Sequence, residues 1–349
     1  MKQPNVLIIK GGRSAENEVS LRSAKNIESA LKKAGFSVAM IEIERNGAWG
    51  TLTGDVLADG QKFLMSPDQH DTNITEQTLV VFPVLHGPYG EDGTIQGFFE
   101  LANIPYVGCG VRASALGMHK GTQKELFAHH GLRVSPWIAV KRFEWEKNND
   151  ETVGRIASSL KNHFPFFVKP ICTGSSVGIS KVSNTKELKQ AMIHAFQFDN
   201  EVIVEQGIAP LRELEVAVLG NDQPEASVVG EIVVDHGFYD YESKYSSTSK
   251  TITRIDPDDL DLHIKNEIRK QAVQAYTLLG CAGLARVDFL VSGNVIYVNE
   301  INTMPGFTAI SMYPKLWEAT GVPFTELCTK LIRLAQESWK IKQSIKMTP

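Results

Sequence analysis

The sequence has 349 residues, and its 42% hydrophobic and 22% charged content is ordinary for a globular protein with room for two or three domains. A net charge of −4 gives no reason to expect a nucleic acid or an anionic membrane as a partner. We expect no signal peptide. We also expect no membrane span, because the longest apolar run (79–85) is short. Because the cysteines lack CxxC spacing, we expect them to be reduced thiols in the cytoplasm.

The first third of the chain reads as alternating strands and helices. Residues 5–9 predict a buried strand, a glycine turn follows, and apolar residues at helical spacing predict a helix that begins at Ser20. Further strands are predicted at 36–43 and 79–85. This order is typical of an α/β domain. The Gly-Gly turn lacks both phosphate-loop signatures, so it is more simply a chain reversal.

Charged side chains follow two of these strands. Glu16 comes after the glycine turn of the first strand, and His86 begins a glycine-rich loop after the third. Such strand ends usually face a ligand crevice in α/β proteins, although a loop histidine is more often only solvated. We expect a further strand at 104–111 and place a domain boundary near residue 108.

The middle of the chain contains two lysines of interest. Residues 114–130 predict a helix that carries Lys120, and an isolated helix lysine is usually solvated. Lys169 lies in an apolar strand, PFFVKP, where a buried ammonium needs a partner. The small-residue loop 173–178 leads to a second strand and can cover a phosphate with its N–H groups, or it can simply be a flexible hairpin tip.

A strand ending at Glu205 is followed by a hinge-like segment whose backbone groups can pair with an adenine edge. Strands at 213–219 and 226–234 predict a hairpin in which Glu213 and Glu215 share a face.

Residues 235–254 are polar and contain three tyrosines and Lys244, which is typical of a lid loop, with disorder as the alternative. Helices are predicted at 258–279 and 324–340.

The apolar runs LARVDFLV and VIYVNEIN, joined at Ser292-Gly293-Asn294, predict a β-hairpin. Arg286 and Asp288 share a face of the first strand, and Glu300 and Asn302 share a face of the second. If the strands pair across the turn, all four side chains converge.

Two carboxylates and an amide suit Mg²⁺, and a neighbouring arginine suits an oxyanion. Gly306 follows, and its N–H can face a ligand. The alternative is a salt-bridged surface hairpin.

Six phrases, in chain order from residue 5 to beyond 320, resemble the D-alanine–D-alanine ligases of the ATP-grasp superfamily. They are GGRSAENEVSLRSAKNI, LHGPYGEDGTIQGFFELANIPYVG, FFVKPICTGSSVGISKV, VIVEQGI, FYDYESKY and ARVDFLV…VNEINTMPGFTAISMYP. Each phrase alone is weak evidence, but their order along the whole chain makes the resemblance specific.

The resemblance implies an α/β, three-domain ATP-grasp fold. Its parts would be a Rossmann-like N-terminal (pre-ATP-grasp) domain at 1–108 and two α+β ATP-grasp subdomains at 109–205 and 206–349, the last with the lid loop and the metal site. It also implies a cytoplasmic, homodimeric enzyme of peptidoglycan synthesis. This enzyme would join two D-alanine molecules through an acyl phosphate, using ATP and two Mg²⁺ ions, with Mn²⁺ as a possible substitute.

Motif matching to this family implies a role for individual residues. The nucleotide-binding set comprises Lys120 and Lys169 at the α- and β-phosphates, Gly174, Ser175, Ser176 and Val177 above them, Glu205, Gly207 and Ile208 at adenine, Glu213 at ribose, Lys244 at the γ-phosphate, and Phe238. The metal and substrate set comprises Asp288, Glu300 and Asn302 at Mg²⁺, Arg286 and Gly306 at the oxyanion, Glu16 and His86 at the first D-alanine, and Ser311 and Met312 at the second. Glu16, Ser175 and Tyr245 would lock the lid.

The chain departs from the family pattern at Asn17 and at His119, where an aspartate is common. The nearest alternative functions are D-Ala–D-Ser and D-Ala–D-lactate ligases, but Tyr245 and Met312 resemble the D-alanine-specific pattern. Another ATP-grasp carboxylate–amine ligase is a wider alternative. A non-catalytic nucleotide-binding protein would be expected to lack a metal ligand or Arg286.

Overall fold

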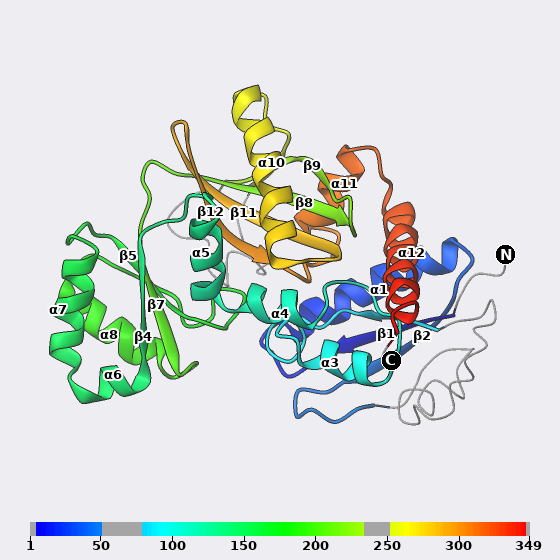
Figure 1. Ribbon diagram of the computed structural model, residues 1–349, viewed down its shortest axis with the longest axis horizontal. Helices are drawn as coiled ribbons and strands as arrows, with labels where there is room; N and C mark the ends of the chain where they lie inside the picture. Colours follow the sequence, from blue (N-terminus) through cyan, green and yellow to red (C-terminus); the bar gives the residue numbers. More distant parts are fainter. Residues whose placement is uncertain (1–4, 51–78, 234–251, 347–349) are drawn as a thin grey trace.

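The computed structural model describes residues 5–50, 79–233 and 252–346 and contains three β-sheets with helices around them (Figure 1). The sheets follow one another in space, with the five-stranded sheet between the three-stranded and the four-stranded ones. None of the described helices is long and apolar enough to cross a membrane.

The three-stranded sheet is parallel, in the order β2-β1-β3, and its apolar core includes the fully buried residues of β1. Its elements are β1 (Asn5–Gly11), α1 (Asn17–Lys33), β2 (Ser37–Ile43), β3 (Val80–Pro83) and α3 (Thr94–Leu101). Helix α1 begins earlier than predicted because its first polar residues bond to the glycine turn: Asn17 donates to Gly12 O at 3.0 Å.

The predicted strand at 104–111 is wrong. Only an isolated bridge joins Tyr106 to Val81, because the backbone turns into a left-handed conformation at Gly108, where φ is +104°. Helix α4 (Val111–Met118) then begins within the predicted strand.

The helix predicted at 114–130 is two helices. His119 has an extended backbone and separates α4 from α5 (Lys120–His129). Its ring Nδ1 accepts a hydrogen bond from Thr122 N at 3.1 Å and caps α5. The histidine therefore performs the capping function that an aspartate would have at the start of a helix.

The four-stranded sheet is antiparallel, in the order β4-β7-β5-β6, and packs against three helices. Its elements are β4 (Trp137–Lys141), α6 (Arg142–Lys147), α7 (Asn149–Ser159), β5 (Phe166–Pro170), β6 (Ser180–Val182), α8 (Thr185–Ala195) and β7 (Glu201–Gln206).

The five-stranded sheet is antiparallel, in the order β10-β9-β8-β11-β12. Its elements and the C-terminal helices are β8 (Arg212–Gly220), β9 (Glu225–Val233), β10 (Ile252–Ile255), α10 (Leu262–Leu279), β11 (Gly283–Ser292), β12 (Val295–Asn302), α11 (Met312–Ala319) and α12 (Phe324–Gln343).

Two predictions in this region need correction. The last residues of the predicted loop 235–254 belong to β10, and residues 235–251 lie outside the described part of the chain. Helix α10 begins at residue 262 rather than 258, because Asp261 caps it by accepting a hydrogen bond from His263 N at 2.7 Å.

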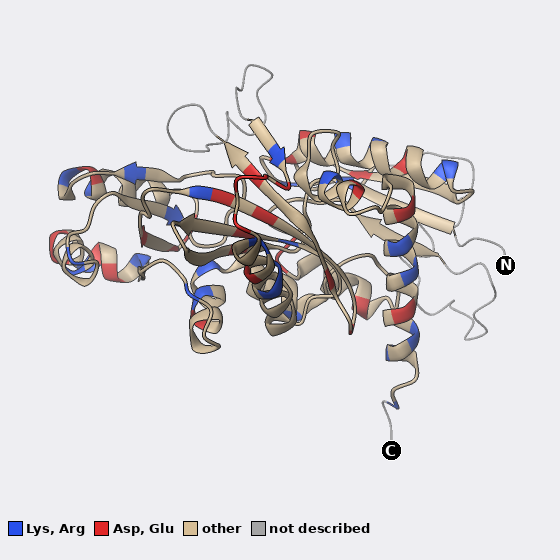
Figure 2. Cartoon of the chain, turned by 90° about the horizontal axis from the view of Figure 1, so that it is seen from above, with Lys and Arg blue, Asp and Glu red and all other residues tan. Residues whose placement is uncertain are grey.

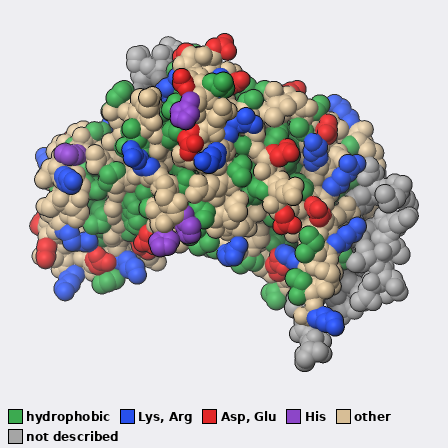
Figure 3. All heavy atoms as spheres, turned by 45° about the horizontal axis from the view of Figure 1, so that its top comes forward, with side chains coloured by type: hydrophobic (Ala, Val, Ile, Leu, Met, Phe, Trp, Pro, Cys, Tyr) green, Lys and Arg blue, Asp and Glu red, His purple; other side chains and the backbone are tan. Residues whose placement is uncertain are grey.

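Charged residues occur on the surface and also on strands near the centre of the molecule. Positive and negative side chains are interspersed over the face shown in Figure 3. Figure 2 shows acidic positions on strands near the centre of the molecule as well as on the peripheral helices. The acidic residues on the central strands are therefore candidates for a functional site between the sheets.

Candidate functional site

A cavity of about 270 Å³ is lined by residues of the four-stranded and five-stranded sheets, and by loop and helix residues that follow strands of the three-stranded sheet. It brings together most residues predicted for the site: Glu16, His86, Lys120, Lys169, Gly174, Ser175, Ser176, Glu205, Gly207, Ile208, Glu213, Arg286, Asp288, Glu300, Asn302, Gly306, Ser311 and Met312. Val177 does not line it, and Phe238, Lys244 and Tyr245 lie outside the described residues.

The β11–β12 hairpin forms one wall of this cavity, as predicted. Ser292 pairs with Val295 across a two-residue turn, and a bulge between Asp288 and Phe289 then shifts the register by one residue, so that Arg286 lies opposite Asn302 and Asp288 opposite Glu300. The four polar side chains therefore converge, as predicted, although the bulge rather than the turn alone brings the two pairs to the same face.

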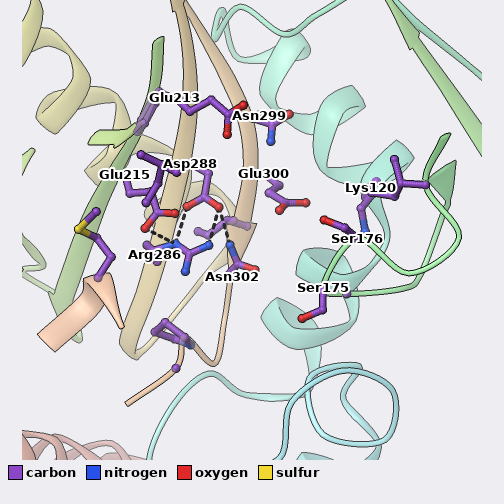
Figure 4. A pocket seen from close by; sticks show the side chains of 18 of the residues that line it. Lys120, Ser175, Ser176, Glu213, Glu215, Arg286, Asp288, Asn299, Glu300 and Asn302 are labelled. Carbon is purple, nitrogen blue, oxygen red and sulfur yellow. Dashed lines mark hydrogen bonds and ion pairs between the residues drawn. The ribbon is translucent and has the colours of Figure 1, made fainter. Parts of the chain in front are cut away.

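Arg286 and Asp288 form a bidentate ion pair, and Asn302 Nδ2 donates to Asp288 Oδ2 at 3.0 Å (Figure 4). Glu215, from β8, lies 3.2 Å from Arg286 Nε. Burial opposes the positive charge of Arg286, but Asp288 and then Glu215 outweigh it and raise the pKa of the guanidinium well above its usual range. The cavity therefore contains a fixed cation.

The donor atoms of the hairpin fit a hard divalent cation. Among the described residues, no group of three or more His, Cys, Asp or Glu side chains is arranged for a metal ion. The candidate set consists instead of two carboxylates and one amide, from Asp288, Glu300 and Asn302. A carboxylate has about four acceptor positions, so Asp288 can keep its three observed hydrogen bonds and still ligate a metal.

A buried ion-pair group lies at the four-stranded sheet. Lys169 Nζ is 2.9 Å from Glu205 Oε2, which confirms that the strand lysine has a partner. Lys124 Nζ is 3.4 Å from Glu205 Oε1, and this residue was not predicted. Burial opposes the negative charge of Glu205, but Lys124 and then Lys169 outweigh it and hold the pKa of the carboxyl at about 2.

The loop 173–178 approaches the N-terminal part of the chain. Ser175 and Ser176 have positive φ angles of 48° and 60°. A Cβ on Gly174 would lie only 2.9 Å from Glu16 Oε2, so a side chain larger than glycine would collide with that carboxylate. Lys120 Nζ donates to Thr173 O, which joins α5 to the same loop.

His86 has a defined tautomer in this site. Its Nδ1 lies 3.0 Å from the carbonyl oxygen of Met304, which only accepts, so Nδ1 carries the proton. Its Nε2 is buried and has no hydrogen-bond partner among the described residues. Burial lowers the pKa of His86, so at neutral pH Nε2 is an acceptor within the cavity lining.

Glu91 also lines the cavity, as expected for an acidic residue of the glycine-rich loop that follows a strand, although no motif assigned it a role. Its Oε2 accepts a hydrogen bond from Gly87 N at 2.9 Å. Burial, followed by the negative charge of Glu16, raises its pKa to about 8. Its position in the His86 loop was the only available signal.

The segment after β12 is held by the N-terminal part of the chain. Phe307 N donates to Ser23 Oγ at 3.1 Å, and Asn26 Nδ2 donates to Phe307 O at 3.0 Å. A Cβ on Gly306 would lie 2.8 Å from Ser311 Oγ, so this position needs glycine. Ser311 precedes α11, whose first N–H groups favour an anion.

Comparison with known proteins gives two family matches. Residues 5–109 match the model described as D-ala D-ala ligase N-terminus, and residues 126–333 match the model described as D-ala D-ala ligase C-terminus.

Three solved structures are similar over almost the whole chain. A D-alanine–D-alanine ligase from Coxiella burnetii is 33% identical and covers 98% of this chain and 97% of its own, with a TM-score of 0.80. The VanG D-Ala:D-Ser ligase from Enterococcus faecalis is 35% identical, and the match covers 95% of this chain and 99% of the VanG chain, with a TM-score of 0.79. A D-alanyl-alanine synthetase A from Vibrio cholerae is 31% identical, and the match covers 96% of this chain and 99% of the synthetase chain, with a TM-score of 0.80.

Proposed function

Since the chain belongs to the D-alanine–D-alanine ligase family of ATP-dependent enzymes, we propose that it joins two D-alanine molecules into D-alanyl-D-alanine, with release of ADP and phosphate. Its mixed α/β architecture is the ATP-grasp fold that the sequence predicted. The observation that carries the substrate proposal is the convergence in one cavity of anion-binding, metal-binding and ammonium-binding side chains.

The chemistry explains why these residue types are needed. A carboxylate is a poor electrophile, so transfer of the γ-phosphoryl group of ATP to the first D-alanine forms an acyl phosphate. The amine of the second D-alanine attacks its carbonyl carbon, and phosphate leaves from the tetrahedral intermediate. A closed site matters because water destroys an acyl phosphate.

The nucleotide would bind between the four-stranded and five-stranded sheets. Lys120 and Lys169 supply positive charge for the α- and β-phosphates, and the N–H groups of the loop 173–178 cover them. Glu205 and the backbone of Gly207 and Ile208 would pair with adenine, and Glu213 would bind ribose.

Asp288, Glu300 and Asn302 would hold two Mg²⁺ ions. Mg²⁺, or Mn²⁺ in its place, would neutralise the charge that develops on the phosphates during transfer. In Figure 4, Glu300 extends from the hairpin toward the side of the cavity that carries Ser176 and Lys120, which supports a metal between the hairpin and the phosphates.

The two D-alanine molecules would bind at the N-terminal side of the hairpin. Glu16 and the Nε2 acceptor of His86 would take the ammonium of the first. Ser311 and the Met312 N–H, at the start of α11, would hold the carboxylate of the second. Arg286 and Gly306 N–H would stabilise the oxyanion of the tetrahedral intermediate. The proposed Glu16–Ser175–Tyr245 contact and the Lys244 contact to the γ-phosphate involve residues beyond the described ranges.

A D-Ala–D-Ser ligase is the second candidate, and a specific finding favours it. VanG, a D-Ala:D-Ser ligase, is 35% identical to this chain. Met312 and Tyr245, which resemble the D-alanine-specific pattern, support D-alanine as the second substrate.

We also propose a role in peptidoglycan synthesis, a cytoplasmic location and a homodimer, on the strength of family membership alone. The three sheets support domain boundaries near 108 and 205. Each of the segments 1–108, 109–205 and 206–349 contains one sheet, except that β7 extends one residue past the second boundary.

The test is ADP release by the purified protein with ATP and Mg²⁺, with identification of the product by mass. D-alanine should give ADP and a dipeptide, whereas L-alanine should give neither. Faster turnover when D-serine or D-lactate is added to D-alanine would contradict the proposed specificity. Absence of ADP with every substrate, despite ATP binding, would favour a non-catalytic nucleotide-binding protein.

A further inference from the structure

Lys124 is a buried lysine that the proposed mechanism does not use; burial lowers the pKa of its ammonium group, and the negative charge of Glu205 opposes that shift. Lys124 extends from α5, and its side chain is only 1% exposed. Its Nζ donates to Ser135 Oγ at 3.1 Å and lies 3.4 Å from Glu205 Oε1. Lys120, one helical turn earlier, lines the cavity, whereas Lys124 does not. Lys124 therefore acts on a ligand only through other residues.

The two oxygens of Glu205 are divided between two lysines. Oε2 pairs with Lys169 at 2.9 Å, and Oε1 pairs with Lys124. Glu205 and Lys169 line the cavity, so a bound ligand can reach both of them. The ligand can compete for Lys169, but it cannot compete for Lys124.

An anion that draws Lys169 away breaks one of these two ion pairs. A carboxylate that is buried and loses its only cation is strongly destabilised. With Lys124 present, Glu205 keeps one cation after Lys169 has moved. Without Lys124, Lys169 would have to choose between Glu205 and the anion.

We propose that Lys124 is a positioning residue that holds Glu205 charged and oriented toward the cavity, so that Lys169 can transfer to the polyphosphate of ATP. This inference rests on the proposed function, because it takes ATP as the occupant of the cavity. It explains why a helix residue without access to the ligand carries a charge inside the protein. The pKa of Glu205, held at about 2 by both lysines, is consistent with a carboxylate that stays ionised.

The inference is tested by the binding of Mg²⁺–ATP and of adenosine to the full chain, measured by calorimetry without D-alanine. Lys124→Met keeps the length of the side chain and removes its charge. The Kd for ATP should rise by about 10- to 100-fold, the range expected for loss of a hydrogen bond to a charged group. The Kd for adenosine, which has no phosphate to recruit Lys169, should rise much less.

A second readout follows from the charge of Glu205. In Lys124→Met, departure of Lys169 leaves the carboxylate without a cation, so it should take up a proton when ATP binds. Calorimetry in buffers of different ionisation enthalpy measures this uptake, which should exceed that of the unaltered protein.

Two further variants keep the test decisive. Lys189→Met removes a surface lysine that pairs with Asp150 at 2.7 Å, and it should leave both affinities unchanged. Ser135→Ala removes only the hydrogen bond to Lys124, and it should raise the Kd for ATP by about two- to tenfold even if Lys124→Met does not fold.

The outcomes separate this inference from the proposed function. Equal loss of ATP and adenosine affinity in Lys124→Met would assign Lys124 a general structural role and overturn the inference, as would unchanged affinities. Failure of the unaltered protein to bind ATP would instead overturn the proposed function, and the inference with it.

Discussion

Arg286 and Asp288, two residues apart on β11, form a bidentate ion pair in which the Nε–Oδ1 and Nη2–Oδ2 distances are both 2.6 Å. One member of this pair is the proposed oxyanion-binding cation, and the other is a proposed metal ligand. The two functions are therefore linked through one contact. A planar guanidinium is needed, because only its fork geometry matches both carboxylate oxygens.

The first prediction concerns Arg286→Lys. The substitution keeps the positive charge but loses the bidentate contact, so kcat for ADP formation should fall by about 10²- to 10³-fold, as for loss of an oxyanion-binding donor. Steady-state kinetics with D-alanine measure the change. Arg254→Lys is the matched control, because Arg254 pairs with Glu231 and Asp259 and does not line the cavity. Equal losses in both variants would contradict a specific role of Arg286.

The second prediction concerns the pH dependence of stability at Glu91. Its pKa of about 8 in the folded state lies above the ordinary value of 4.5, so the folded protein binds the extra proton. Stability from this group is present below about pH 4.5 and falls as pH rises toward 8. Glu91→Gln cannot ionise, so its stability relative to the unaltered protein should increase across this window. Urea unfolding at pH 5, 6, 7 and 8 measures the unfolding free energies of both proteins. A difference between them that does not change with pH would contradict the raised pKa of Glu91.

The third prediction concerns Glu205→Gln. This change leaves Lys124 and Lys169 buried without a counter-charge and should destabilise the protein by about 3–5 kcal/mol at neutral pH. The folded-state pKa of Glu205 is depressed to about 2, so its contribution is complete above about pH 4.5 and is lost as pH falls toward 2.

Urea unfolding between pH 6 and pH 3 checks this sign. The difference in unfolding free energy between Glu205→Gln and the unaltered protein should shrink as the pH falls. Glu225→Gln, at an exposed position on β9, is the control and should change stability by less than about 0.5 kcal/mol. A difference for Glu205→Gln that grows in acid would show that the buried carboxylate does not stabilise the lysines.

The fourth prediction concerns Gly306→Ala. The added methyl group would lie 2.8 Å from Ser311 Oγ, so it would displace either Ser311 or the Gly306 backbone N–H. Because misplacement by about 1 Å can cost 10²-fold in rate, kcat should fall by roughly that factor. Gly97→Ala in α3 is the control, since its Cβ meets nothing within 4 Å, and it should stabilise the helix by about 0.5–1 kcal/mol. Full activity of Gly306→Ala would exclude a role for this N–H.

Local sequence patterns predicted the central hairpin and the polar residues that share a face within each strand. Side chains alternate along β11 and β12, and the two-residue turn Gly293-Asn294 sets the register as far as Phe289, which lies opposite Val298. Beyond Phe289 a bulge shifts the register by one residue. This bulge, which the sequence did not predict, places Glu300 opposite Asp288, so the predicted convergence depends on it.

Local patterns failed where one residue changes the backbone direction. Gly108 interrupts the predicted strand at 104–111, and His119 divides the predicted helix at 114–130 by capping a new one. Helices α7 and α8 were not predicted, although asparagines cap both, because their buried faces are short and lie among charged residues.

The sequence by itself determined the family, the order of strands and helices in most of the chain, and the residue types of the site. The tertiary structure alone decided which charges share one buried space. Lys124 on α5 resembles an ordinary surface lysine in sequence, and the position of Glu91 in a loop after a strand predicted that it faces a ligand but not that it is buried beside another acid. Burial lowers the pKa of Lys124 and raises that of Glu91. Packing decides this burial because it brings together segments that are distant in the chain, whereas periodicity reports only neighbouring residues.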